Sequence, residues 1–208
     1  MPPKEFKING AKVKVIVGTP CRLDFNIDAR LVTFVMHNIF QGIVGGYRIL
    51  PSRSAEDGRN LIADWFVNEC KDSPHLFWMD SDTAPRDLFA LQKLLALNKP
   101  VVSGVTPIYF KQGGSANGQA QPDRAAGTMV WNAMFAPEPG MGNGLQFRMG
   151  TLPDRPFKAS CFGGTTILIQ RKVMESLKPP YYLTRRDPVT NIIVEGEDYY
   201  FANKIKSA

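Results

Sequence analysis

Hydrophobic and polar positions follow two alternating patterns along the chain. Runs of β-branched and aromatic residues, typical of strands, lie at 12–17, 47–50, 75–79, 101–105 and 166–169. Apolar residues at helical spacing predict helices at 28–40, 59–70, 86–97, 172–177 and, near the end, 199–206. We expect Gly18–Pro20 to end the first strand and the polar residues 52–58 to form a turn. Strands alternating with helices predict a layered α/β sheet with right-handed crossovers.

A stretch at 111–156 breaks this alternation, because it is rich in glycine and proline. A long connection inside a compact domain is usually functional or mobile. Within it, the apolar residues at 129–131 and 145–147 predict two short hairpin strands. We therefore expect one domain over 1–208 that carries an insertion at 111–156, formed by a loop or hairpin.

The composition is that of a globular protein, with 208 residues, 44% of them hydrophobic and 21% charged. The chain contains no apolar run of membrane-spanning length, and residues 1–10 lack the apolar core of a signal peptide. We therefore expect a cytoplasmic protein. Its three cysteines are odd in number and widely spaced, which favours reduced, mostly buried thiols over a disulfide framework.

The formal net charge of +6 favours anionic partners in general. A sugar nucleotide, a nucleic acid and an acidic membrane surface all satisfy it. Because lysine and arginine form no dense block in the sequence, the charge alone is weak support for nucleic-acid binding.

The clearest chemical motif is Asp80-Ser81-Asp82, which follows the apolar run at 75–79 directly. Two carboxylates at the end of a buried strand repel each other, and a divalent cation removes that cost. Ligands also gather beyond the carboxyl ends of strands in open α/β sheets. The motif therefore predicts metal and diphosphate binding. The alternative is a polar turn in which Ser81 or Asp82 caps the following helix.

Two further polar clusters carry weaker indications. Glu195, Glu197 and Asp198 include a candidate general base, although acids are also common in the first turn of a helix. The second cluster is Arg53, Asp57, Arg59 and Asn60, whose side chains suit phosphate, base or ribose recognition or, alternatively, a solvated loop and helix cap. Gly163–Gly164 permits close approach of a substrate or forms a turn before a strand.

The order of these parts resembles the GT-A fold glycosyltransferases, in particular the large family-2-like group with a DxD motif. The segments that carry the resemblance are Val-Ile-Val-Gly-Thr-Pro at 15–20, Arg59-Asn60, Leu-Phe-Trp-Met-Asp-Ser-Asp at 76–82, Pro-Val-Val-Ser-Gly at 100–104, Gly-Gly-Thr-Thr-Ile-Leu-Ile-Gln-Arg at 163–171 and Gly-Glu-Asp-Tyr-Tyr-Phe at 196–201. The resemblance covers nearly the whole chain outside the insertion. It implies a Rossmann-like, mostly parallel mixed sheet flanked by helices.

The resemblance also implies a function and a role for each matching position. With the assistance of Mn²⁺ or Mg²⁺, the chain would transfer a sugar from a UDP-sugar donor to an acceptor hydroxyl. The transfer would invert the configuration at the anomeric carbon. The nucleotide side would comprise Thr19, Pro20, Asp57, Arg59, Asp80 and Ser81. Asp82 would ligate the metal, with Asp80 on the ribose or the metal. Gly163 and Gly164 would line the acceptor side, where the insertion at 111–156 would also lie. Glu197–Asp198 would supply the base, Asp198 foremost.

One departure concerns the metal shell. Many relatives place a further ligand, often histidine, after the late acidic pair, whereas both histidines here, His37 and His75, precede it. Either the chain is a piece of a longer one, or water completes the shell, or metal binding is weak.

Two other functions stay open. A nucleotidyltransferase would also use paired acids and a metal, but it usually has a glycine- and arginine-rich phosphate loop where Gly18–Arg22 has one glycine. A non-catalytic carbohydrate- or nucleic-acid-binding protein is the other alternative. The basic charge further suggests a polyanionic acceptor, for example modified DNA.

Overall fold

The computed structural model describes residues 7–8, 11–12, 14–23, 26–109, 129–134, 146–148, 155–159 and 161–208. The chain divides into two compact units. The first unit comprises residues 1–104, 164–183 and 204–208. The second unit comprises residues 105–163 and 184–203.

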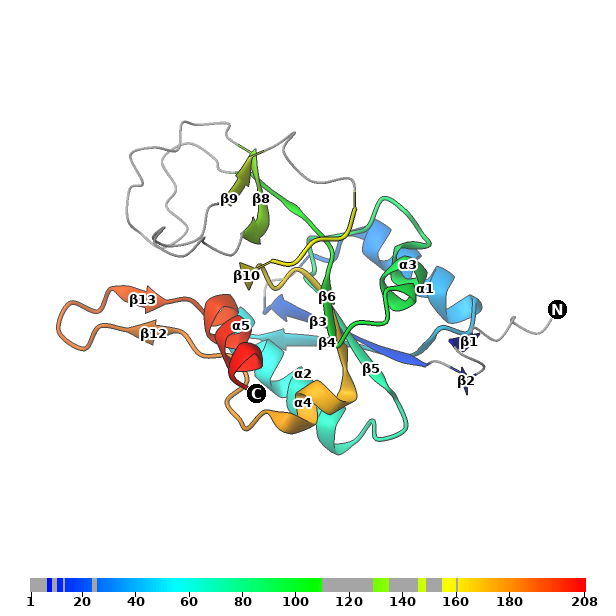
Figure 1. The fold of residues 1–208 in the computed structure, drawn as a ribbon, viewed down its shortest axis with the longest axis horizontal. Helices are drawn as coiled ribbons and strands as arrows, with labels where there is room; N and C mark the ends of the chain where they lie inside the picture. Colours follow the sequence, from blue (N-terminus) through cyan, green and yellow to red (C-terminus); the bar gives the residue numbers. More distant parts are fainter. Residues whose placement is uncertain are drawn as a thin grey trace. The chain divides into compact units, whose positions relative to one another are not determined.

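The first unit is built around a five-stranded mixed sheet with the strand order β4-β3-β5-β11-β6 (Figure 1). Its strands are β3 (Val15–Arg22), β4 (Val44–Ser52), β5 (His75–Met79), β6 (Val101–Ser103) and β11 (Thr166–Gln170). β3 pairs in parallel with both β4 and β5, whereas β11 runs antiparallel to both β5 and β6. The predicted α/β architecture with a mixed, mostly parallel sheet is therefore confirmed at this level.

Helices cover both faces of this sheet, as Figure 1 shows. One face carries α1 (Ala29–Phe40) and α3 (Ala90–Ala96), and the other carries α2 (Ala55–Asn68) and α4 (Arg171–Ser176). Alternate residues of a strand point to opposite faces, so Val15 and Val17 pack with α1 and α3 in one hydrophobic core. Gly18 faces α2, where a Cβ atom would lie 2.4 Å from Ile62 Cγ2, so that only glycine allows this approach.

Local signals explain where the helices begin and end. Asp28 caps α1 by accepting a hydrogen bond from the Arg30 backbone N–H, and Gly42, with φ of 70°, follows its C-terminus in the left-handed conformation. Ser54 caps α2 in the same way, since its side chain accepts from the Asp57 N–H at 3.0 Å. α2 therefore begins four residues before the predicted start at 59, and residues 55–58 form its first turn rather than the predicted polar turn.

Two other predicted boundaries are wrong. β3 continues through Gly18–Pro20 to Arg22, because β4 pairs with it as far as Ser52. On its other side the pairing with β5 ends at Gly18, so no hydrogen bond on that side requires an N–H group at Pro20. The predicted helix at 86–97 begins only at Ala90, because Asp87 forms a turn instead. Its carboxylate accepts the Phe89 N–H and its carbonyl accepts the Ala90 N–H.

The first unit also holds a short N-terminal hairpin and the end of the last helix. Strands β1 (Lys7–Ile8) and β2 (Ala11–Lys12) form the hairpin. The helix α5 (Glu197–Ser207) starts in the second unit, and its last turn belongs to the first. There the Lys204 ammonium donates to the carbonyls of Lys178 and Pro180.

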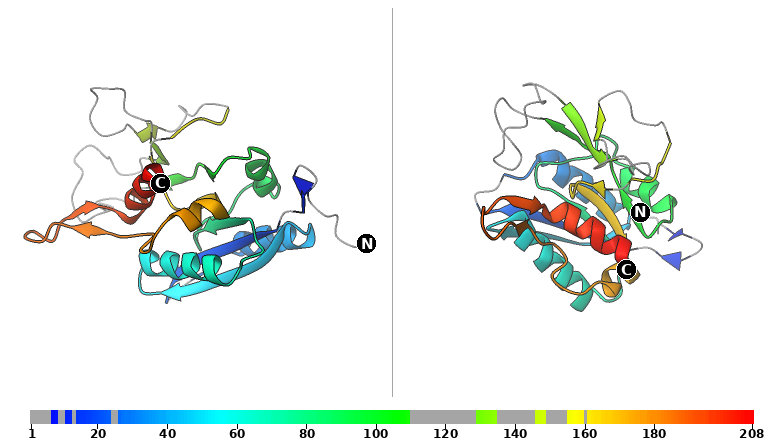
Figure 2. Two further views of the ribbon diagram at one scale, coloured as in Figure 1. Left: turned by 60° about the horizontal axis from the view of Figure 1, so that its bottom comes forward. Right: turned by 60° about the vertical axis from the view of Figure 1, so that its left-hand side comes forward.

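The second unit contains a four-stranded antiparallel sheet and a separate hairpin. The sheet consists of β7 (Pro107–Tyr109), β8 (Met129–Met134), β9 (Gln146–Arg148) and β10 (Cys161–Phe162). Since β8 pairs with β9, the hairpin strands predicted at 129–131 and 145–147 are confirmed, while most of the remaining 111–156 insertion lies outside the described residues. The hairpin β12 (Arg185–Arg186) and β13 (Ile193–Glu195) is drawn in orange in Figure 2 and leads into α5.

Among the described residues, no helix has both the length and the apolar character needed to cross a membrane.

Candidate functional site

The parallel strands of the first unit bring their carboxyl ends to one edge of the sheet. β3 pairs with β5 only as far as Gly18 opposite Trp78, whereas its pairing with β4 continues for four more residues. β3 and β5 therefore part after Gly18. The strand order also reverses here, because β4 is added on one side of β3 and β5 on the other. In open α/β sheets ligands bind at this kind of point.

The acidic motif forms a tight turn at this place. The Thr83 N–H donates to the Asp80 carbonyl at 3.1 Å, and we call residues Asp80–Thr83 the acidic turn. Two further backbone hydrogen bonds hold it: the Asp80 N–H donates to the Thr165 carbonyl at 3.0 Å, and the Asp28 N–H donates to the Ser81 carbonyl at 2.9 Å. The turn is thus tied to the residue before β11 and to the N-cap of α1.

The Asp80 carboxylate pairs with a buried arginine of α2. Arg59 Nη2 lies 3.2 Å from Asp80 Oδ1 and 3.3 Å from Oδ2. The arginine side chain is 4% exposed and the aspartate side chain 22% exposed. A desolvated guanidinium needs a counter-charge, so this pair holds Asp80 in one orientation.

An aromatic pair encloses the same arginine. The Arg59 guanidinium lies over the Tyr182 ring at 5.4 Å from its centroid. The Tyr182 ring meets the Trp78 ring edge-on, with 5.4 Å between the centroids. Tyr182 and Trp78 are both fully buried. Arg59, predicted on the nucleotide side, is therefore packed inside the first unit and reaches the sheet edge through Asp80.

Asn60 holds Tyr182 in place from the neighbouring position of α2. Its Oδ1 accepts the backbone N–H groups of Tyr181 at 2.8 Å and Tyr182 at 3.0 Å. Its Nδ2 donates to the Tyr182 carbonyl at 2.8 Å. The side chain that could have recognised a base or ribose thus makes three hydrogen bonds to backbone. Neither tyrosine carried a functional signal in the sequence, because they lie 121 and 122 positions from Asn60.

The two remaining residues of the motif differ from Asp80 in exposure. Asp82 is exposed, and its Oδ1 accepts a hydrogen bond from the Thr83 hydroxyl at 3.3 Å. Ser81 is half-buried. Since Asp80 is engaged with Arg59, Asp82 offers the more accessible carboxylate of the acidic turn.

A nearby third carboxylate, Asp28, is turned toward Arg30. Arg30 Nε lies 3.0 Å from Oδ1, and Arg30 Nη2 lies 2.5 Å from Oδ2. The hydrogen bonds from the Arg30 side chain, and then from its backbone N–H, lower the pKa of Asp28 to about 2. Asp28 therefore stays ionised near neutral pH, but with its oxygens directed to arginine.

The acidic turn fits one kind of metal site. Within the described ranges, no group of three or more histidine, cysteine, aspartate or glutamate side chains is placed to hold a metal. Mg²⁺ is usually held by one or two carboxylates together with substrate phosphates and waters. The donor set of Asp82 and Asp80 therefore fits a cation that arrives with a phosphate ligand.

The end of β3 and the start of α2 pack closely beside this edge. Thr19 and Pro20, predicted on the nucleotide side, are buried, whereas Asp57 in the first turn of α2 is exposed. A Cβ atom at Gly58 would lie 2.6 Å from Ser52 Oγ and 3.0 Å from Pro20 Cβ. Glycine at this position lets α2 begin directly against the strand ends.

Cys21, next to this segment, is not a candidate nucleophile. Its thiol is free and the residue is 5% exposed. Burial raises the pKa of the Cys21 thiol, so the unreactive protonated form prevails at neutral pH.

The predicted acceptor-side and base residues fall in both units. Gly164 belongs to the first unit and is buried next to Thr165, whose carbonyl accepts the Asp80 N–H. Gly163 belongs to the second unit. Glu197 and Asp198 also belong to the second unit, where they form the first turn of α5 and are half-buried.

A set of contacts inside the second unit fixes the start of α5. Arg185 on β12 pairs with Glu195 on β13, with 3.4 Å between Nη1 and Oε2, and lies over the Tyr200 ring of α5 at 5.0 Å. The Asn203 side chain donates to Glu195 Oε1 at 2.9 Å. Glu195, considered with the other acids in the sequence, is thus a link between the hairpin and α5.

The comparisons with known proteins concern the fold. No model of a known family matches the chain, and no curated protein matches it. A solved structure described as "Crystal Structure of A197 from STIV" is similar, with a TM-score of 0.58 and 20% sequence identity. The match covers 93% of this chain and 78% of that one. At this identity the likeness is one of fold.

Proposed function

We propose that the protein is a GT-A glycosyltransferase that moves a sugar from a UDP-sugar to an acceptor hydroxyl. One observation carries the proposal: an Asp-x-Asp turn stands at the carboxyl end of β5, with Asp80 held by buried Arg59 and Asp82 exposed. This is the place where a doubly wound sheet binds nucleotides, and the motif is the one that GT-A enzymes use for a metal-bound diphosphate.

In this proposal the first unit binds the donor. Asp82 holds Mn²⁺ or Mg²⁺ together with the diphosphate, and Asp80 contacts the ribose or the metal. When bound, the metal neutralises negative charge that develops on the leaving diphosphate. Arg59 acts through Asp80, because its own side chain is 4% exposed. Asp57, exposed in the first turn of α2, contributes from the nucleotide side.

The proposed base is Asp198, as the family resemblance implies. Asp198 accepts the proton of the acceptor hydroxyl while that oxygen attacks the anomeric carbon of the donor sugar. A new carbon–oxygen bond forms, the bond to the diphosphate breaks, and nucleoside diphosphate leaves. A single displacement of this kind inverts the configuration at the anomeric carbon. Glu197, beside Asp198 in the same helical turn, is the second candidate.

The donor site is tested by removing the exposed carboxylate. We expect Asp82→Ala to abolish Mn²⁺-dependent UDP binding in calorimetry while thermal unfolding is unchanged, because Asp82 is exposed. The matched control is Asp72→Ala, which removes an exposed aspartate from the opposite end of β5 and should bind as the unmodified protein does. Equal affinity in the Asp82 and Asp72 variants would refute the assignment of Asp82.

The base is tested separately from donor binding. For Asp198→Asn we expect unchanged UDP affinity with sugar transfer reduced at least 100-fold, as is typical for loss of a general base. Glu197→Gln in the same turn tests the second candidate and should retain sugar transfer if Asp198 is the base. Near-normal turnover of the Asp198 variant would exclude this residue as the base.

The products distinguish the alternative functions. Incubation with a panel of UDP- and GDP-sugars and Mn²⁺ should release a nucleoside diphosphate, whereas a nucleotidyltransferase releases pyrophosphate and a binding protein releases neither. Absence of all turnover and of any thermal shift with UDP and metal would end the transferase proposal.

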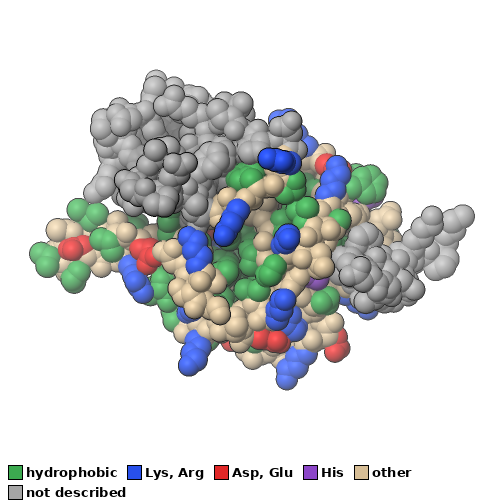
Figure 3. Space-filling view, in the orientation of Figure 1, with side chains coloured by type: hydrophobic (Ala, Val, Ile, Leu, Met, Phe, Trp, Pro, Cys, Tyr) green, Lys and Arg blue, Asp and Glu red, His purple; other side chains and the backbone are tan. Residues whose placement is uncertain are grey.

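The acceptor class is suggested by charge. The chain has a formal net charge of +6. On the face drawn in Figure 3, lysine and arginine side chains are spread over the described surface. A diffuse positive surface favours a polyanionic acceptor, such as DNA with hydroxylated bases. Transfer to another acceptor, with none to such DNA, would reject this class while leaving the transferase proposal intact.

A further inference from the structure

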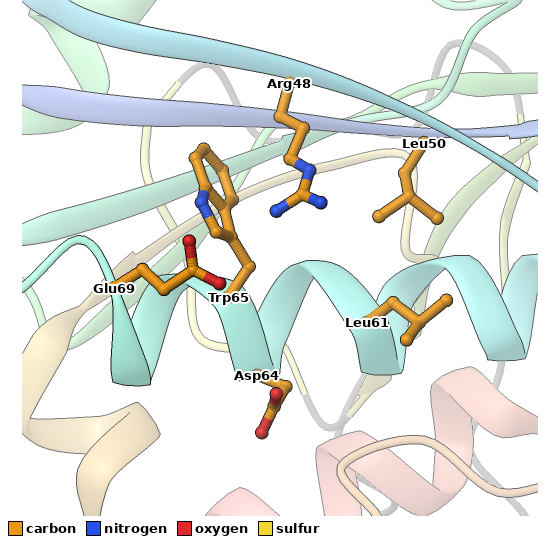
Figure 4. A pocket seen from close by; sticks show the side chains of 6 residues that line it. All are labelled: Arg48, Leu50, Leu61, Asp64, Trp65 and Glu69. Atoms are coloured by element: carbon orange, nitrogen blue, oxygen red, sulfur yellow. The ribbon is translucent and has the colours of Figure 1, made fainter.

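A groove on the first unit lies away from the acidic turn, between an edge strand and a helix. It has a volume of about 360 Å³ and is lined by Arg48, Leu50, Leu61, Asp64, Trp65 and Glu69 (Figure 4). Arg48 and Leu50 come from β4, Leu61, Asp64 and Trp65 come from α2, and Glu69 is the C-cap residue of that helix. The groove therefore lies between β4 and the second half of α2.

The strand that borders this groove has an open edge. β4 is nine residues long and ends the strand order, and among the described residues it pairs with β3 alone. Its outer edge therefore presents backbone N–H and C=O groups that can pair with another extended chain. Since Arg48 and Leu50 are two positions apart, both point to the α2 face, as would every second side chain of an added strand.

The lining has two chemically different parts. Leu50 and Leu61 lie close together in Figure 4 and form an apolar part, and Leu61 is 53% exposed. The other part holds Trp65 and Glu69, with the Arg48 guanidinium over the Trp65 ring at 4.9 Å. With Asp64, the lining has two exposed carboxylates against one guanidinium in a chain whose net charge is +6.

We propose that β4 and α2 form a docking site for an extended peptide that adds to the sheet as a further strand. Backbone pairing with β4 supplies affinity, and side chains at alternate positions enter the groove and supply specificity. The favoured peptide carries an apolar side chain for Leu50 and Leu61 and a basic one, two positions away, for Glu69, while Asp64 adds to the negative charge of the lining. This proposal does not depend on the proposed transferase activity.

A second copy of the chain suits this edge less well. Arg48 is the central residue of β4, so symmetrical antiparallel pairing of two full-length β4 strands places Arg48 opposite its own copy. Like charges directly opposite each other destabilise a strand pair. A peptide with basic and apolar residues meets no such repulsion.

The probe for this site is a fluorescein-labelled peptide, Thr-Leu-Thr-Lys-Thr-Leu-Thr-Lys, with blocked ends. We expect micromolar binding in fluorescence anisotropy and slower amide hydrogen exchange over 44–52 when the peptide is bound. Replacing both lysines by glutamate, or N-methylating every second residue in each of the two registers, should weaken binding at least tenfold. Equal binding of the N-methylated peptides would overturn strand addition.

Variants of the groove complete the test. Leu61→Ser and the double change Asp64→Asn with Glu69→Gln should each weaken the probe at least tenfold, and circular dichroism checks that both remain folded. Val32→Ser is the matched control, because Val32 is 40% exposed on α1, which covers the other face of the sheet. No probe binding, binding indifferent to these changes, or a dimer in light scattering that Leu61→Ser converts to monomer would overturn the proposal.

Discussion

Replacing Asn60 by alanine tests how the buried Arg59–Asp80 pair is held in position. The Asn60 amide makes three hydrogen bonds to the backbone of Tyr181 and Tyr182. Tyr182 in turn packs its ring against the Arg59 guanidinium. The substitution removes the amide and leaves the three backbone groups without these partners, in a segment where both tyrosines are buried.

The expected loss follows from these contacts. Each hydrogen bond contributes about 1 kcal/mol net, so three contribute about 3 kcal/mol. Alanine forms helix more readily than asparagine, which offsets about 0.5 kcal/mol of this loss in the interior of α2. The net destabilisation is about 2.5 kcal/mol, which lowers the unfolding temperature by roughly 5–10 °C for a chain of this length. The freed Tyr182 segment should also loosen Asp80 and weaken metal-dependent UDP binding.

Urea unfolding followed by circular dichroism measures the first effect, and calorimetry with UDP and Mn²⁺ measures the second. The control is Asn68→Ala on the same helix, because Asn68 is exposed and its amide donates to the Asp64 carboxylate. That variant should stay within about 0.5 kcal/mol of the unmodified protein, as is usual for surface substitutions. A loss of stability below about 1 kcal/mol for Asn60→Ala would refute the argument that the Asn60 side chain holds the Tyr181–Tyr182 backbone in place.

Two further predictions concern the core of the first unit. Gly18→Ala should destabilise the protein by about 1–3 kcal/mol, because the added Cβ would overlap Ile62. Gly196→Ala is the control and should not show this cost, because no atom lies within 4 Å of its Cβ. Urea unfolding compares the two variants, and equal stability would refute the steric argument. Burial lowers the pKa of His75 from its ordinary 6.5, so the unfolded chain binds the proton more readily and stability should fall as the pH drops below about 6.5. His75→Gln should reduce this fall between pH 7.5 and 5, and an unchanged pH dependence would show that His75 does not cause it.

The sequence predicted the elements best where burial alone determined them. β5 matches its predicted range, because all but its first residue are buried and a turn motif follows directly. β3 is longer than predicted, since a Gly-Thr-Pro segment normally ends a strand but here pairs on one side with β4. The start of α2 was missed because Ser54 acts as an N-cap before a polar first turn, where no apolar periodicity is visible.

The candidate site was predictable in position but not in its internal contacts. The acidic triplet after an apolar run was enough to place Asp80 and Asp82 at the end of a strand. The packing of Arg59 between Asp80 and Tyr182 depends on a contact between segments far apart in the sequence, which no local pattern reveals. A single sequence therefore indicated which side chains could do chemistry, but not which of them are engaged inside the protein.

The way residues 105–163 leave and re-enter the first unit bears on how the protein can diversify. This segment departs after Gly104 and returns at Gly164, at the paired ends of β6 and β11, where the Gly104 N–H donates to the Thr166 carbonyl at 2.8 Å. The flanking strands β6 and β11 therefore hold the points where the segment departs and returns, independently of the sequence of the segment. Doubling the length of a segment closed in this way costs only about 0.6 kcal/mol of chain entropy. Segments of other lengths and sequences could be exchanged at this junction while the sheet and the acidic turn keep their structure.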